Sequence, residues 1–289
     1  MSGMAGGRSR KLVIGLAFSA IILAGCTAQE RDGYAKGNIP LETFSAEQIF
    51  ERGEYELDRK DGERAAYYFG EVERLYPYSD WSKRALIMQA YAYHLEKDYE
   101  NSRSSAQRYI DFYPTDDDAA YAQYLLALSY YDQIEEVGRD QGLTFQALQA
   151  LRTVIERYPD SEYARSSILK FDLAFDHLAA KEMEIGRYYL RRQHYGAAIN
   201  RFRSVVEDFQ TTTHTPEALH RLVEAYLSLG LVNEAQTAGA ILGYNYQGTV
   251  WYADTYALLT GRGLELKLKV SGDNWLAQVY RQMVKGQWL

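Results

Sequence analysis

Cysteine, proline and long apolar runs are all scarce in this chain. It has 1 cysteine and 5 prolines in 289 residues, whereas 47% of its residues are hydrophobic and 25% are charged. This composition excludes a disordered or collagen-like chain and predicts a folded one. The formal net charge of -7 gives no overall basic field for phosphate groups, so we expect no nucleic acid partner. Tyrosine, by contrast, is abundant: the 26 tyrosines exceed what a core needs and indicate wet aromatic surfaces.

The first 25 residues have the organisation of a targeting signal. Three basic residues, Arg8, Arg10 and Lys11, precede an apolar run of 12 residues from Leu12 to Leu23. That run is too short to span a bilayer as a helix, which takes roughly 20 residues. We therefore interpret residues 1–25 as a signal peptide.

The apolar run ends in Leu23-Ala24-Gly25-Cys26, and Cys26 is the single cysteine of the chain. This ending resembles the lipobox of bacterial lipoproteins, in which the cysteine thiol receives a diacylglycerol thioether, the signal is cleaved before it and the new N-terminus is acylated. The resemblance implies that several acyl chains hold Cys26 on a membrane, where a single chain binds only marginally. Two alternatives stay open: an ordinary secretory signal with a chance cysteine, and an uncleaved anchor.

The residues after Cys26 indicate a destination and a linker. Thr27 follows the cysteine; in such lipoproteins an Asp at that place often marks inner-membrane retention, so the resemblance implies the outer membrane. Residues 26–44 include Gly33, Gly37 and Pro40, and we expect them to form a lipidated, flexible tether.

From Ser45 onward the spacing of apolar residues predicts helix after helix. Three similar phrases, EVERLYP, QRYIDFYP and TVIERYP, end at Pro77, Pro114 and Pro159, and a fourth, VVEDFQ, lacks the proline. The intervals of 37 and 45 residues between these prolines are typical of stacked helix pairs. We predict an all-α fold, a tetratricopeptide-like superhelix of about five helix-turn-helix repeats.

The tetratricopeptide pattern places a small residue in the first helix of a repeat and Ala-x3-Phe in the second. Small residues let the two helices approach closely, and large ones fill the space to the next pair. The first repeat matches at Gly53, Ala65 and Phe69, and the fourth at Gly186, Ala198 and Phe202. The second, third and fifth match more loosely, at Ala90, Ala106 and Tyr109, at Ala147, Leu151 and Val154, and at Leu222, Tyr226, Ala235 and Leu242.

Several polar residues are expected to start helices. The predicted N-caps are Ser45 in a capping box with Gln48, Ser161 or Asp160 after Pro159, and Thr215 before Pro216. Asp116 to Asp118 could form a metal cluster, but we favour a helix N-terminus for this acidic run.

An unusually long helix is expected between about Ser161 and Arg192, and it offers a weak boundary between two halves of the stack. We assign residues 45–160 to repeats 1–3, residues 161–250 to repeats 4–5, and residues 251–289 to a helical C-terminal extension.

No pattern for catalysis or cofactor binding stands out. The five histidines are not spaced to share a helical face beside a catalytic acid, and neither a zinc motif nor a nucleotide-binding loop is present. We expect no catalytic residue, metal or cofactor. A stack of helix pairs offers a concave surface for an extended peptide or a partner's helix, so we predict a binding function. Tyr93, Tyr189 and Tyr226 fit repeat packing better than binding.

The phrases ERLYPYSDWS and YYLRRQHYGAAINRFRSVVEDF, together with the lipobox and the repeats, resemble the BamD (ComL) family. The resemblance covers roughly residues 26 to 245. It implies an outer-membrane lipoprotein on the periplasmic side, a subunit of the β-barrel assembly machinery that works beside other Bam lipoproteins. It also implies that the N-terminal repeats bind the aromatic-ended C-terminal segment of unfolded outer-membrane proteins, while the C-terminal repeats dock the last POTRA domain of BamA.

Five residues carry the family's binding roles by this resemblance. Tyr76, Pro77 and Tyr78 lie where the family has a substrate-contacting turn, and Asn200 and Arg201 where it contacts BamA. A guanidinium at 201 can form a bidentate pair with a partner's carboxylate.

This chain departs from the family at two places. Glu63, followed by Arg64, stands where a basic residue is expected, which weakens the case for a cationic patch that binds a terminal carboxylate. The turn at Tyr78-Ser79 also lacks the glycine often found there.

Two other functions stay open on sequence alone. One is a tetratricopeptide lipoprotein that coordinates cell-wall synthesis or envelope constriction, for which an N-terminal coiled coil would be expected. The other is an enzyme, such as a wall hydrolase with its site in the groove.

Overall fold

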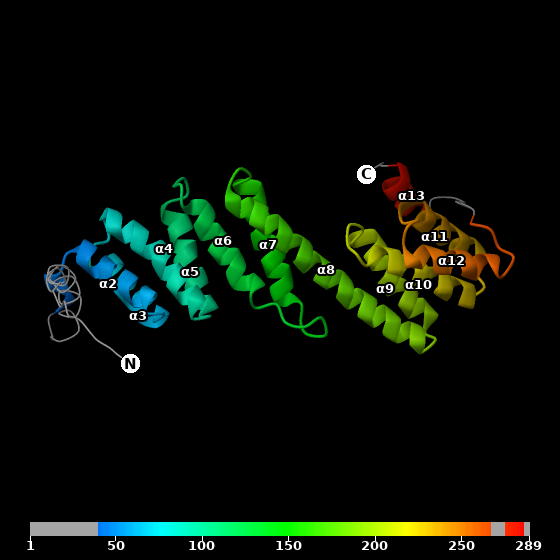
Figure 1. Cartoon of the computed structure of the whole chain (residues 1–289), viewed down its shortest axis with the longest axis horizontal. Helices are drawn as coiled ribbons and strands as arrows, with labels where there is room; N and C mark the ends of the chain where they lie inside the picture. Colours follow the sequence, from blue (N-terminus) through cyan, green and yellow to red (C-terminus); the bar gives the residue numbers. More distant parts are fainter. Residues whose placement is uncertain (1–39, 267–274, 286–289) are drawn as a thin grey trace, which may run out of the picture. The chain divides into compact units, whose positions relative to one another are not determined.

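The computed structural model describes residues 40–266 and 275–285, so the predicted signal peptide, the lipobox at Cys26 and the tether up to residue 39 lie outside the described residues. Within these ranges the chain is all-α (Figure 1). The described residues 40–45 belong to a first unit and contain one short 3-10 helix, η1 (Leu41–Thr43), and the described residues from Ala46 onward belong to a second unit. No described helix has the length and apolarity needed to cross a membrane.

Twelve α-helices make up the described part of the second unit. They are α2 (Ala46–Asp58), α3 (Gly62–Leu75), α4 (Asp80–Leu95), α5 (Tyr99–Phe112), α6 (Ala119–Tyr131), α7 (Gly142–Arg157), α8 (Glu162–Arg191), α9 (Tyr195–Asp208), α10 (Thr215–Ser228), α11 (Val232–Asn245), α12 (Val250–Thr260) and α13 (Trp275–Lys285).

Each helix from α2 to α10 packs against the one that follows it. The first helices of successive pairs also touch, since α2 contacts α4, α4 contacts α6, α6 contacts α8 and α10 contacts α12. These contacts confirm the predicted all-α stack of helix-turn-helix repeats.

The glycine–phenylalanine pairs explain why two of the hairpins close so tightly. A Cβ built on Gly53 would stand 2.8 Å from Cδ1 of Phe69, and one on Gly186 would stand 2.8 Å from Cδ1 of Phe202. Both rings are fully buried. Real Cβ atoms essentially never lie within 3.0 Å of another heavy atom. Only glycine therefore leaves room for the phenylalanine ring where the two helices cross. The alignment of the first and fourth repeats is therefore confirmed.

The turns between repeats share one local design. The backbone N–H groups of Tyr76 and Tyr158 donate to carbonyls one turn back in α3 and α7. Ser79 and Ser161, three residues further on, then cap α4 and α8 by accepting from Ser82 N and Ala164 N at 3.1 Å each. Ser161, and not Asp160, is thus the cap of α8.

One predicted cap is wrong. His214, not Thr215, occupies the N-cap position of α10, and Pro216 lies in the first turn. Thr215 is the first helical residue, and its hydroxyl donates backwards to the carbonyls of Phe209 and Gln210 at 3.0 and 3.1 Å. Thr215 is fully buried, and its hydroxyl bonds to the preceding turn and does not cap the helix.

The acidic run at 116–118 joins two repeats. Asp116 accepts hydrogen bonds from Lys83 Nζ and from the Tyr109 hydroxyl, each at 2.6 Å, and from the backbone N–H of Asp118 at 3.1 Å. Asp118 is the N-cap residue of α6 but makes no side-chain cap bond. Over the residues that the structure describes, no group of three or more potential ligand side chains could hold a metal ion.

The long helix is present as α8, with 30 residues. It packs on α7 as far as its middle, where Leu148 meets Ala174 and Leu178, and its last part packs on α9 through Gly186 (Figure 1). One apolar cluster runs from Ala179 on α8 to Val279 on α13, so the C-terminal helices share one core. Whether the two halves of the stack have separate functions stays a prediction.

Candidate binding surfaces

The predicted substrate turn, Tyr76 to Tyr78, connects α3 to α4 and stands on the surface. The Tyr78 side chain is fully exposed, at 101%, whereas Tyr76 is half-buried. Ser79 holds the turn by donating from its hydroxyl to the carbonyl of Tyr76 at 2.9 Å. Because Ser79 supplies this bond and caps α4, the turn needs no glycine at this place.

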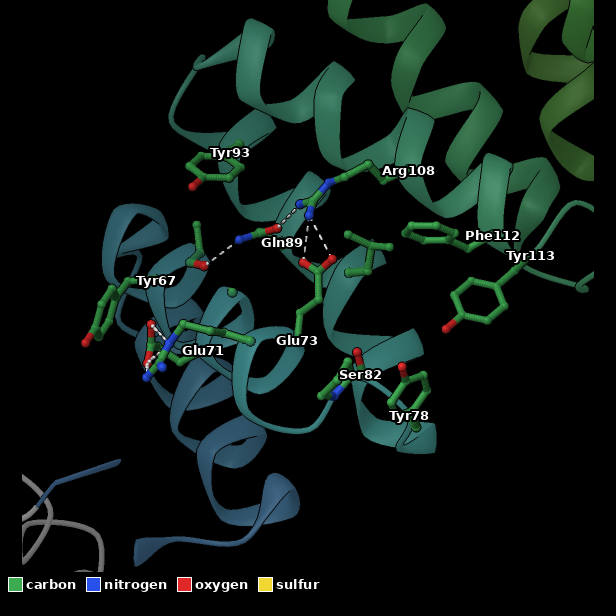
Figure 2. Close-up of a pocket in the computed structure, with 15 residues that line it drawn as sticks. Tyr67, Glu71, Glu73, Tyr78, Ser82, Gln89, Tyr93, Arg108, Phe112 and Tyr113 are labelled. Atoms are coloured by element: carbon green, nitrogen blue, oxygen red, sulfur yellow. Dashed lines mark hydrogen bonds and ion pairs between the residues drawn. The ribbon is translucent and has the colours of Figure 1, made fainter. Parts of the chain in front are cut away.

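Beside this turn lies a pocket of about 780 Å³ (Figure 2). The second helices of the first two repeats, α3 and α5, form its sides, and α4 lies between them. The lining residues are Ala66, Tyr67, Gly70, Glu71, Glu73 and Arg74 from α3, Pro77 and Tyr78 from the turn, Ser82, Leu86, Gln89 and Tyr93 from α4, and Arg108, Phe112 and Tyr113 from α5 and its end.

The middle of the pocket is a polar network. Arg108 Nη1 donates to both carboxylate oxygens of Glu73 at 2.7 and 2.9 Å, and its Nη2 donates to Gln89 Oε1 at 3.1 Å. Gln89 Nε2 in turn donates to the carbonyl of Ala66 at 3.1 Å, and the Ser105 hydroxyl donates to Gln89 Oε1. The network connects α3, α4 and α5, so it fixes the two repeats to each other as well as the pocket floor.

Aromatic rings stand around this network. Figure 2 shows Tyr67 and Tyr93 on one side of the Arg108–Glu73 pair and Phe112, Tyr113 and Tyr78 on the other. Tyr67 and Phe112 are more than half exposed, at 56% and 65%. Burial raises the pKa of Tyr93, so its hydroxyl stays protonated and can donate near neutral pH.

The sequence had suggested only the turn, not the pocket. Gln89, Arg108, Tyr67 and Phe112 were missed, because nothing in a helical pattern shows which exposed residues of separate helices converge. A signal did exist: Glu73 and Arg108 both lie in the repeated phrases that precede Pro77 and Pro114.

The two residues at the family's basic position contribute nothing to this pocket. Arg64 pairs with Asp61 at 2.6 Å and with the buried Glu56 at 3.1 Å, and the side-chain hydrogen bond that it donates to Asp61 is the main cause that raises its pKa. Glu63 is exposed on the first turn of α3. Neither side chain lines the pocket.

The second predicted surface lies on α9 and the end of α8. Asn200 and Arg201 line a shallow pocket of about 230 Å³ together with Tyr189, Ala197 and Ser204. Arg201 already has a partner inside the chain, since its Nη1 lies 3.1 Å from Glu182 Oε2. Its side chain is nevertheless 44% exposed, which leaves part of the guanidinium open to a second partner.

The tyrosines predicted to serve in packing differ from one another. Tyr226 is buried in the core, which raises its pKa to about 12. Its hydroxyl forms a hydrogen bond with the Trp275 side chain of α13. Tyr189 packs on the same core but also lines the Arg201 pocket, and Tyr93 lines the larger pocket. Tyr93 and Tyr189 therefore have both a packing and a surface role.

The fold defines the class: a helical-repeat protein, with these two pockets on separate repeats. The family model described as outer membrane lipoprotein, YfiO, matches residues 42–241, and the chain belongs to this family. The resemblance inferred from the sequence is thereby confirmed.

Two relatives are similar over most of the chain, and both bear the name outer membrane protein assembly factor BamD. The one from Caulobacter vibrioides is 47% identical over 245 residues, which cover 85% of this chain and 79% of the relative. The one from Rickettsia prowazekii is 40% identical, with 86% of this chain and 96% of the relative covered. Among solved structures, the TPR domain of P58(IPK) aligns at a TM-score of 0.38 and 12% identity, covering 83% of this chain and 65% of that chain.

Proposed function

We propose that this chain is a lipid-anchored scaffold of the outer membrane, facing the periplasm, that assists the folding and insertion of β-barrel proteins and has no catalytic activity. Family membership and the assembly-factor name of its relatives support this role. The single observation that carries the binding function is the aromatic-walled pocket beside Tyr78.

The pocket suits an extended segment of an unfolded barrel protein. Strands of such barrels alternate apolar and polar residues, with aromatic side chains near their ends. Rings of this kind pack well on Tyr67, Phe112 and Tyr113, which add contact area at little cost in side-chain entropy. The hydroxyls of Tyr67, Tyr93 and Tyr113 add donors and acceptors for the peptide backbone.

The C-terminal surface suits a folded partner. We assign Asn200 and Arg201 to the contact with a POTRA domain of BamA, and other Bam lipoproteins to neighbouring surfaces. The half-exposed guanidinium of Arg201 supports this assignment, because it can accept a further carboxylate while Glu182 holds it in position.

Photo-crosslinking in living cells tests the pocket. A crosslinking residue at position 78 should trap unfolded outer-membrane proteins, because this side chain is fully exposed at the pocket rim. The control is the same residue at Tyr244, which is 67% exposed on α11 and outside the pocket. Equal trapping of barrel proteins from both positions, or none from position 78, would contradict the proposal.

Depletion tests the role in the cell. Loss of the protein should leave unfolded barrel proteins in the periplasm. Normal barrel levels together with a defect in envelope constriction would instead favour the cell-wall alternative.

The anchor has its own test. Cys26→Ala removes the thiol that the lipobox chemistry requires, so the variant should appear in soluble fractions after cell lysis. Attachment that survives washing without detergent would refute the lipid anchor.

A further inference from the structure

The charges that line the large pocket are balanced. Of its lining residues four carry a formal charge, namely Glu71, Glu73, Arg74 and Arg108. The two arginines and two glutamates give this lining a net charge of zero.

Each arginine of the lining already holds a carboxylate. Arg108 binds both oxygens of Glu73 across the space between α5 and α3. Arg74 binds Glu71 within α3, with Nη2 at 2.6 Å from Oε2. These are charge-assisted contacts of short length, the strong kind among protein hydrogen bonds.

The Glu73–Arg108 pair is also difficult to open. Glu73 is only 23% exposed. The Arg108 side chain is 41% exposed, but both of its terminal nitrogens are engaged, Nη1 by Glu73 and Nη2 by the buried Gln89, whereas Arg201 uses only Nη1. A peptide carboxylate that approached Arg108 would have to displace Glu73 or stand beside it. Either arrangement places like charges together in a partly desolvated site, which disfavours binding.

The remaining contacts available to a ligand are uncharged. They are the rings of Tyr67, Tyr93, Phe112 and Tyr113 with the tyrosine hydroxyls, because the buried amide of Gln89 is already bonded within the chain. These groups recognise aromatic side chains and backbone amides, and none distinguishes a chain end from the middle of a chain.

We propose that the Glu73–Arg108 pair is a specificity-determining element, which neutralises the pocket so that it recognises aromatic side chains and gains nothing from a peptide's terminal carboxylate. This inference rests on the proposed function, because it assumes that peptide segments enter the pocket. It fits the absence of a basic residue at position 63 and the internal pairing of Arg64.

Binding of matched peptides to the full chain tests the inference. The probe is a short synthetic peptide with alternating aromatic residues, prepared once with a free C-terminal carboxylate and once as the C-terminal amide. The wild-type chain should bind both forms with affinities within about twofold. The reason is that both arginines of the lining stay paired with glutamates, so neither gains a new ion pair with the peptide's carboxylate. Replacement of the peptide's aromatic residues by alanine should abolish measurable binding of both.

A single substitution should create the missing preference. Glu73→Gln keeps the shape and an acceptor oxygen for Arg108 but removes the competing charge. The variant should then bind the acid form about tenfold or more tightly than the amide, since a guanidinium without a carboxylate partner gains a charge-assisted pair. The matched control is Glu135→Gln, which removes an exposed glutamate near Arg139, outside the pocket, and should leave the ratio unchanged.

Two exposed rings locate the binding. Tyr67→Ala and Phe112→Ala should weaken both peptides to the same degree, and neither change should affect folding because both rings are more than half exposed. Thermal unfolding of every variant provides the check on folding.

The possible outcomes separate the two proposals. A wild-type chain that binds the acid at least tenfold better than the amide overturns the inference, and so does a folded Glu73→Gln variant without acid preference. Failure of the wild type to bind either peptide, or binding indifferent to Tyr67 and Phe112, refutes the proposed function of the pocket instead.

Discussion

The first and fourth repeats have nearly the same interior but different exteriors. In both, a glycine of the first helix lies against a buried phenylalanine of the second, at Gly53–Phe69 and Gly186–Phe202. On the outside, the first repeat contributes one side of a pocket of about 780 Å³, whereas the fourth carries a shallow one of about 230 Å³.

The arginines of the two surfaces show the same divergence. Arg108 of the second repeat reaches Glu73 of the first and thereby connects two repeats. Arg201 pairs with Glu182 inside its own repeat. An ion pair between two repeats shapes the groove between them. An ion pair within one repeat has no effect on that groove. The interior contact therefore forms the hairpin, and the exterior differs from one repeat to the other.

The second repeat fills the same interior differently. Ala106 stands eight residues before Pro114, as Phe69 stands eight before Pro77, so no ring occupies this place. Tyr109, one turn further, is the fully buried ring instead. Its hydroxyl needs a partner, and Asp116 beyond the turn supplies one at 2.6 Å.

The largest expected effect concerns the phenylalanines. Phe69→Ala and Phe202→Ala each remove a fully buried ring and should lower the free energy of unfolding by about 3–5 kcal/mol. Because the two rings have equivalent contacts with glycine, the two losses should be similar in urea unfolding. An unchanged transition for either variant would show that the hairpins are not equivalent.

The glycines should give a smaller effect of the same kind. Gly53→Ala and Gly186→Ala place a methyl group where the phenylalanine ring lies, and this overpacking should cost about 1–3 kcal/mol. The control is Gly196→Ala at the start of α9, where a Cβ meets nothing within 4 Å. Thermal unfolding of the three variants should separate the two tight positions from the open one.

Acid should lower the stability of the second repeat, whose buried Tyr109 is bonded to Asp116. Hydrogen bonds from Lys83 and Tyr109 lower the pKa of Asp116 from 3.8 to about 2. A lowered pKa in the folded state means that this carboxylate stabilises the fold above about pH 4, and that the contribution disappears as the pH falls towards 2. The stability difference between wild type and Asp116→Asn, measured in urea from pH 5 to pH 2, should therefore shrink. A constant difference would show that Asp116 does not titrate in this range.

The smallest effects distinguish the two arginines. Arg108→Ala removes bonds to Glu73 and Gln89 and should cost about 1–2 kcal/mol. Arg201→Ala breaks a surface pair and should cost less than about 1 kcal/mol while weakening capture of BamA. Pull-down of BamA alongside thermal unfolding checks both quantities. A large loss of stability in Arg201→Ala would make this residue structural.

The repeat interiors were predictable because they depend on local spacing. The intervals between the Tyr-Pro turns and the positions of Gly53, Phe69, Gly186 and Phe202 identified the hairpins before any coordinates. The N-cap of α10 could not be predicted in the same way, because the Thr215 hydroxyl donates back across the preceding turn to the carbonyl of Phe209.

Sequence by itself determined the hairpins, their order and the family, since periodic small and large residues leave one way to close a helix pair. Only the tertiary structure decided which exposed side chains meet. Glu73, Gln89 and Arg108 belong to three helices, and their distances depend on how neighbouring repeats pack. The pocket and its balanced charge therefore arise from contacts between repeats. The spacing of residues within one repeat does not predict these contacts.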